Sequence, residues 1–346
     1  MDNTPNAYST IDAMNSLTDE YDIFLHDGDF AYNIEDANGM RGDDFFDSVQ
    51  TAISSKPYLM TPGNHENIDK GQMLNYRFRM PGLANDNFPY RNHWYSFDVQ
   101  NIHFTSINLD WYIKLHPGDP AGARKQLLDW LESDMLKSSK IDYKYRIMFT
   151  HRPIFCGQPN IATDCSFYFY LNKPIEDLLM KYKYDLVLQA HLHDYTRLWK
   201  TFSFVRLRSS SLDLGAYDGP AYVISGHSGT VHYFPEVLKP SHESQLNQRY
   251  ITGKDANFLH VEIDDQKINV MLKDSVTREV EDEFIVFHNR HYRVGPGVNG
   301  KIFWAELNFD SEFPDFSEIA RILPPNSSSE FKGLRFFLRL RNSGNF

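Results

Sequence analysis

The sequence is short of cysteine, of positive charge and of long apolar runs, and each shortage limits what the chain can be. Its two cysteines, Cys156 and Cys165, lie nine residues apart, and either buried free thiols or a local disulfide would fit them. A disulfide would indicate an oxidising compartment. A formal net charge of -11 argues against nucleic acid as a partner, because phosphate backbones are bound by basic surfaces.

No apolar run is long enough for a transmembrane helix, so we expect no membrane span. The first residues, MDNTPNAYST, are polar and do not form a signal peptide. The 346 residues, 41% of them hydrophobic, suffice for one large domain or two with an ample core.

The hydrophobic pattern changes along the chain. Helices are expected at 8–20, 43–54, 119–137 and 175–182, alternating with strands at 58–60, 93–99, 102–110, 146–149 and 186–188. From Tyr195 onward the pattern is all-β, with strands expected at 195–199, 222–226, 258–264, 268–274 and 283–287. Units of βαβ type followed by antiparallel strands predict an α/β fold of two sheets packed face to face, with helices outside.

Beyond about residue 290 this pattern ends. The segment 289–346 has a Ser/Asn-rich stretch with a sequon at Asn326 and a short basic, apolar end. We expect this tail to be peripheral or disordered, with a functional amphipathic segment as the alternative.

Four apolar segments end in side chains that bind metals: Tyr21–Tyr32, Tyr58–Glu66, Tyr145–Pro153 and Asp185–Tyr195. Ligands of α/β sheets collect in the loops beyond the carboxyl ends of strands. The segments supply the candidate ligands Asp29, Tyr32, Asn64, His151, His191 and His193, with His65 beside them. Any one of these residues has an ordinary explanation as a core, turn or surface residue. Their recurrence at all four strand ends favours a shared site.

The chemistry of this set indicates a two-metal hydrolytic centre. Asp29 offers a carboxylate that can bridge two cations, and the phenol of Tyr32 suits Fe(III) better than zinc or magnesium. Imidazole and amide groups complete a mixed set of nitrogen and oxygen donors without thiolate. Such a pair activates water and clamps the oxygens of a phosphoryl group. His65 follows a ligand and is free to act as a general acid.

These blocks together resemble those of the purple acid phosphatases, within the calcineurin-like metallophosphoesterase superfamily. The resemblance covers about residues 1–288 and is closest to the long, animal-type branch. It is carried by Gly28-Asp29-Phe30-Ala31-Tyr32, Gly63-Asn64-His65-Glu66, Thr150-His151-Arg152-Pro153 and Ala190-His191-Leu192-His193. It implies a four-layer α/β/β/α sandwich as the catalytic domain over 1–288, with 289–346 as a tail of unknown character.

The resemblance also implies the cofactors and their ligands. These are Fe(III) and a divalent ion, Zn, Fe or Mn, with Asp29 as the bridge. Tyr32 and His193 would bind the ferric ion, Asn64, His151 and His191 the divalent ion, and His65 would assist the leaving group. The expected activity is the hydrolysis of small phosphate monoesters at acidic pH, by a secreted or lysosomal (vacuolar) enzyme.

Two departures from the family pattern leave alternatives open. Ala190 stands where the family has a glycine, and we expect its additional methyl group to be tolerated there. The family's first block would place a further aspartate immediately before Met1, so that ligand, the first strand, the amino-terminal β-sandwich and the signal peptide are expected to be missing. A phosphodiesterase or nucleotide pyrophosphatase on the same site is one alternative. The other is an inactive relative that acts as a binding protein.

Overall fold

The computed structural model describes residues 5–66, 72–81, 92–114, 120–156, 169–202, 205–206, 217, 219–229, 247–251 and 256–287. The predicted tail at 289–346 and the sequon at Asn326 lie outside these residues.

A seven-stranded mixed sheet carries half of the candidate site. Its strand order is β11 (Asn247–Ile251), β7 (Tyr195–Leu198), β10 (Ala221–Ser225), β6 (Leu186–Gln189), β5 (Tyr145–Thr150), β4 (Ile102–Ile107) and β3 (Trp94–Val99). The central strands β10, β6, β5 and β4 run parallel, whereas β7 and β3 are antiparallel to their neighbours. Parallel order places the carboxyl ends of β5 and β6 at the same edge.

Smaller sheets complete the β structure of the described residues. Strands β1 (Phe24–His26) and β2 (Tyr58–Met60) pair in parallel, and β12 (Asn257–Ile263), β13 (Lys267–Asp274) and β14 (Val280–Phe287) form an antiparallel meander. A short ribbon joins β8 (Thr201–Phe202) to β9 (Val205–Arg206).

Alternation along the central strands divides the core in two. Ile147 and Phe149 of β5 face a core that also contains Met60 of β2 and Val270 of β13, so the sheets pack face to face. Met148 points the other way, into a second core. There it meets the helices α5 (Leu109–Lys114), α6 (Pro120–Ser139) and α7 (Phe169–Lys181).

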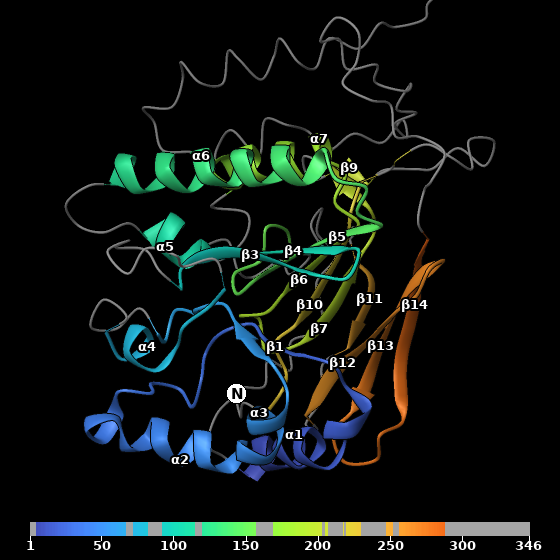
Figure 1. The fold of residues 1–346 in the computed structure, drawn as a ribbon. Coiled ribbons are helices and arrows are strands. Elements are labelled where there is room, and N and C mark those ends of the chain that lie inside the picture. Colours follow the sequence, from blue (N-terminus) through green and yellow to red (C-terminus); the bar gives the residue numbers. More distant parts are fainter. Residues whose placement is uncertain are drawn as a thin grey trace, which may run out of the picture. The chain divides into compact units, whose positions relative to one another are not determined.

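The first helices cover the small sheet on its outer side (Figure 1). These are α1 (Pro5–Ser16), α2 (Met40–Ser48) and α3 (Gln50–Ser55). The 3-10 helices η1 (Thr18–Glu20) and η2 (Asp36–Gly39) belong to the same part of the chain, and the short α4 (Gln72–Arg77) comes after β2. Ile11 of α1 and Phe45 of α2 belong to the same buried cluster as Met60 and Val270. The order helix, sheet, sheet, helix confirms the predicted α/β fold class.

All four predicted helices differ from the observed ones in their bounds, and the helix expected at 8–20 is α1 at Pro5–Ser16 followed by η1. Two of the differences are larger in kind. The helix expected at 43–54 is divided at Val49, because the Asn15 side chain inserts there. Asn15 donates to the Ser48 carbonyl at 2.8 Å and accepts the Ala52 N–H at 3.1 Å. The helix expected at 175–182 begins earlier, at Phe169, and contains Pro174. The hydrophobic pattern predicts neither feature. The division at Val49 depends on the distant side chain of Asn15, and Pro174 would normally end a helix.

Candidate metal centre

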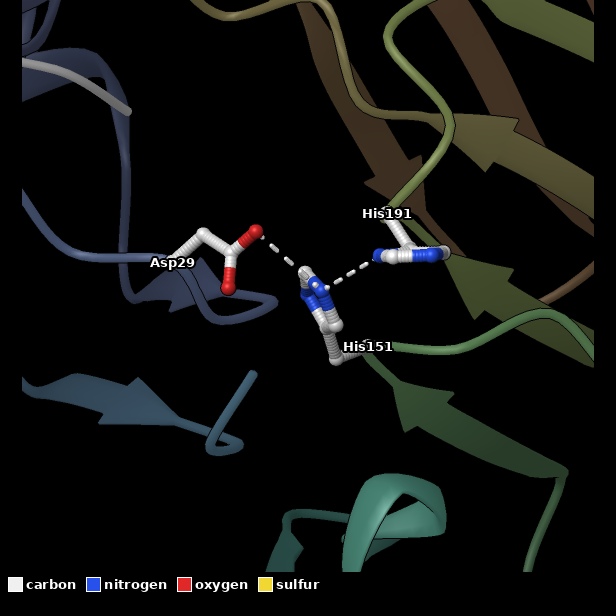
Figure 2. A group of neighbouring side chains, drawn as sticks. All are labelled: Asp29, His151 and His191. Carbon is white, nitrogen blue, oxygen red and sulfur yellow. Dashed lines mark hydrogen bonds and ion pairs between the residues drawn. The ribbon is translucent and has the colours of Figure 1, made fainter. Parts of the chain in front are cut away.

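Four strand ends from two sheets meet at the candidate site. The loop after β1 carries Asp29, and the loop after β2 carries Asn64. His151 follows β5 directly, and His191 lies in the turn after β6. Figure 2 shows His151 between the other two labelled side chains, Asp29 on one side and His191 on the other.

The ligand atoms of this group converge on His151. Its Nε2 lies 3.3 Å from Asp29 Oδ2, 3.2 Å from His191 Nδ1 and 3.1 Å from Asn64 Oδ1. Asp29, His151 and His191 offer atoms that all lie within 4.8 Å of one another. Asp29 and His151 are almost fully buried, at 4% and 1% exposure, whereas His191 and Asn64 are partly exposed.

The orientation of His151 fits a metal ligand. Its Nδ1 lies 2.6 Å from the Asp27 carbonyl oxygen, which can only accept, so the Nδ1 proton is committed to that bond. Nε2 therefore turns toward three atoms that carry lone pairs. A single Nε2 proton could satisfy one of them well, whereas a cation would satisfy all of them together. A backbone carbonyl that orients a ligating histidine in this way is common at metal sites.

Asp29 and His151 also form an ion pair when no cation is present. Burial raises the pKa of the Asp29 carboxyl. The positive charge of His151 and its hydrogen bond to Asp29 outweigh burial, and they hold this pKa well below its usual range. For His151, burial lowers the pKa, but the charge and hydrogen bond of Asp29 raise it to about 9. A cation and a proton would thus compete for Nε2.

Tyr32 and His193 form a separate pair beside this group. The Tyr32 hydroxyl and His193 Nε2 share a hydrogen bond at 2.6 Å. The His65 ring lies against the Tyr32 ring, with centroids 4.4 Å apart. The backbone N–H of His65 donates to Asp29 Oδ1 at 3.1 Å. The structure thus brings all seven candidate residues to one edge, four around His151 Nε2 and the other three around Tyr32.

Three residues at the site were not singled out from the sequence. Asn33 Oδ1 accepts a hydrogen bond from His65 Nδ1 at 2.8 Å. Beside His151, the Arg152 guanidinium donates from Nε to the buried carboxylate of Asp110. In both hydrogen bonds the two partners are far apart in the sequence. Arg152 stood within a recognised block, but no neighbouring residue indicated its contact with Asp110.

The third is Glu66, whose carboxylate is 1% exposed and accepts backbone N–H groups from both ligand loops. Burial and then the charge of Asp29 raise the pKa of Glu66 to about 8, against the lowering effect of the Gly63 and Phe30 N–H groups. Its place in the Gly63-Asn64-His65-Glu66 block was the only sequence signal for it.

Cys156 is disulfide-bonded, which answers the question that the sequence left open; Cys165, the other cysteine, lies outside the described residues. Within the described part of the chain, no helix combines the length and apolarity needed to cross a membrane.

Comparison with known proteins identifies the family of this chain. Residues 3–195 match the family model of the calcineurin-like phosphoesterases. The chain is 35% identical to human (Homo sapiens) acid phosphatase type 7 over 60% of its own length and 48% of that protein. It is 28% identical to a probable purple acid phosphatase of Arabidopsis thaliana, over 61% of this chain and 46% of that one.

The fold has a counterpart among solved structures. A purple acid phosphatase from yellow lupin (Lupinus luteus) seeds superposes with a TM-score of 0.61 at 19% identity, covering 82% of this chain and 49% of that one. The chain spans about half the length of the curated relatives it matches. It is homologous to the animal acid phosphatases type 7 and the plant purple acid phosphatases. Because the family model matches more than half of the sequence, this chain belongs to the calcineurin-like phosphoesterase family.

Proposed function

We propose that this chain hydrolyses small phosphate monoesters at a binuclear metal centre, most actively at acidic pH. One observation carries the proposal. Four strand-end loops direct the donor atoms of Asp29, Asn64 and His191 at His151 Nε2, whose tautomer is set by the Asp27 carbonyl. Family membership and relatives named acid phosphatases support phosphate-ester hydrolysis as the reaction class.

The division of the donors supports two cation positions. Asn64, His151 and His191 would hold a divalent ion, Zn, Fe or Mn, and the Tyr32–His193 pair would hold Fe(III), with Asp29 between them. A phenolate is a good ligand for the ferric ion and a poor one for the divalent ions. Cations held there would supply activation of water and neutralisation of the phosphate charge.

His65 is proposed as the general acid. Its Nδ1 proton is held by Asn33 Oδ1, and its ring is braced by the Tyr32 ring. This leaves Nε2 to donate a proton to the leaving oxygen of the ester. The buried pair of Arg152 and Asp110 fixes the chain next to His151.

We also propose that 1–288 is the catalytic domain and that 289–346 is a separate tail. The disulfide at Cys156 supports a secretory or lysosomal location, since such bonds persist in oxidising compartments.

The proposal is tested with p-nitrophenyl phosphate and bis(p-nitrophenyl) phosphate, before and after metal removal by a chelator. We expect hydrolysis of the monoester to be lost on chelation, restored by iron with zinc or manganese, and reduced at least about 100-fold in D29N. Preference for the diester would identify a phosphodiesterase instead. Metal binding without hydrolysis of either ester would identify a binding protein.

The role of His65 needs substrates with different leaving groups. A general acid matters most when the leaving oxygen is basic, so H65Q should lower kcat for phenyl phosphate by about 100-fold or more, and less for p-nitrophenyl phosphate. Metal content should be unchanged. Equal losses on both esters would contradict proton donation by His65.

A further inference from the structure

The Glu66 carboxyl group lies where the two ligand loops of the small sheet meet. Its Oε2 accepts the Asp29 N–H at 2.7 Å and the Gly63 N–H at 2.8 Å, and its Oε1 accepts the Phe30 N–H at 2.8 Å. One side chain thus satisfies backbone donors in the loop after β1 and in the loop after β2. Buried N–H groups without acceptors would destabilise the fold.

The loop that Glu66 holds has an unfavourable backbone. Asp29, Ala31, Tyr32 and Asn33 have φ angles of 57°, 52°, 46° and 85°, all in the left-handed region. Residues other than glycine rarely adopt this conformation, although Asp and Asn do so more readily than Ala and Tyr. Two proposed ligands, Asp29 and Tyr32, stand in this run, so their directions depend on contacts that keep the backbone there.

The loops also approach each other too closely for side-chain packing to set their spacing. A Cβ on Gly63 would lie 2.2 Å from Asp29 Oδ1 and 2.7 Å from the Asp29 nitrogen. Backbone meets backbone at this point, and hydrogen bonds to a shared acceptor can fix such a contact.

We propose that Glu66 is a positioning residue, which holds the two loops in metal-binding geometry before any cation enters. The inference rests on the proposed function in assuming that the loops bind metals. The fixed conformation of the loops that it describes, however, is a property of the metal-free chain. Glu66 is placed to act on Asp29 through backbone N–H groups and not by direct contact with a cation.

Glutamine cannot replace this carboxyl group. All three partners are donors, and both side-chain oxygens accept from them, whatever the protonation of Glu66. A glutamine has the same shape but one nitrogen without a lone pair, which would face an N–H group. E66Q therefore removes at least one bond and sets two donors against each other, with little change in volume.

The matched control is E176Q. Glu176 of α7 is also 1% exposed, and its helix packs on the far side of the seven-stranded sheet, away from both loops. It reports the general effect of neutralising a buried glutamate. A melting temperature of E66Q close to that of E176Q would show that the fold survives both changes.

Hydrogen exchange on metal-stripped protein gives the first readout. In the wild type and in E176Q, we expect the amides of Asp29, Phe30 and Gly63 to exchange at least tenfold more slowly than in E66Q. The second readout is zinc affinity, which should fall about 10–100-fold in E66Q, as for other groups that orient ligands. The wild-type exchange measurement stands alone if E66Q does not fold.

Two results would overturn the inference: unprotected amides at these positions in metal-stripped wild type, or unchanged zinc affinity in a folded E66Q. Failure of the proposed function looks different. A wild type with protected amides that binds zinc but hydrolyses no phosphate ester would refute the phosphatase and leave the role of Glu66 intact.

Discussion

Gly63 shows how little space the site leaves at the scale of single residues. Any side chain there would meet Asp29 Oδ1 and the Asp29 backbone nitrogen, neither of which can move without displacing a proposed ligand. At Gly39 the restriction is of another kind. Its φ of +89° disfavours other residues, but the nearest atom is the flexible end of the Arg77 side chain at 3.0 Å.

These two glycines give the first prediction. G63A should lower the free energy of unfolding by about 3 kcal/mol through overpacking and should also abolish tight metal binding. G39A should cost only about 1 kcal/mol, from its left-handed backbone, and leave metal binding unchanged. Urea denaturation and zinc titration measure both effects. Wild-type metal affinity in G63A would show that the loops can separate without harm to the site.

At the scale of secondary-structure elements, a buried histidine joins three of them. His103 of β4 places Nδ1 2.7 Å from Asp98 of β3 and Nε2 3.1 Å from Asp134 of α6. The hydroxyl of Tyr143 donates to Asp98 at 2.6 Å, and Arg146 is the nearby cation. Burial lowers the pKa of His103, but the hydrogen bonds and charges of Asp134 and Asp98 raise it overall.

This arrangement predicts stability that depends on pH. Because the pKa is raised on folding, the contribution of His103 is fully present below its unfolded pKa of about 6.5 and is lost as pH rises through the higher folded value. H103Q should therefore lose about 2 kcal/mol at pH 5 and clearly less at pH 9. Urea denaturation at the two pH values measures the difference.

The control for this prediction is H260Q. Burial, and then Lys273, lower the pKa of His260, so its removal should cause no special loss at acidic pH. An equal loss in H103Q at both pH values would mean that His103 acts only through packing.

How far the sequence predicted these elements depends on whether their signals were local. The strand expected at 58–60 matches β2, and the strands before His151 and His191 are correct to within one residue, because a short apolar run and its polar ending lie in the segment itself. The short strand β11 and the helix α4 were not predicted. Glu66 and Asn33 stood in or beside recognised blocks, but their contacts join residues 37 and 32 positions apart, which no local pattern reports.

At the scale of the whole molecule, mainly side chains hold the β12–β13–β14 meander to the rest of the described chain, beside a backbone hydrogen bond from the Asn257 N–H to the His227 carbonyl at 2.9 Å. Within the described residues it shares no backbone ladder with another sheet. Apolar residues of β13, such as Ile268 and Leu272, enter the core between the sheets. Polar contacts add to this packing. Asp282 of β14 binds the Arg197 guanidinium at 2.8 and 3.0 Å and accepts from the Tyr195 hydroxyl at 2.7 Å, and Lys144 donates to Asp265 at 2.6 Å.

This contact between the sheets leads to the last prediction. The side chains of Arg197 and Asp282 are only 17% and 10% exposed, so removal of one partner leaves a largely desolvated charge. D282A should lower the free energy of unfolding by about 3 kcal/mol, whereas R197M/D282L should lose less, because two apolar groups of similar size leave no charge unpaired. A double-mutant cycle in urea, with R197M and D282L as the single variants, measures the coupling. Additive losses would mean that the Arg197–Asp282 pair adds nothing to the other contacts that hold the meander.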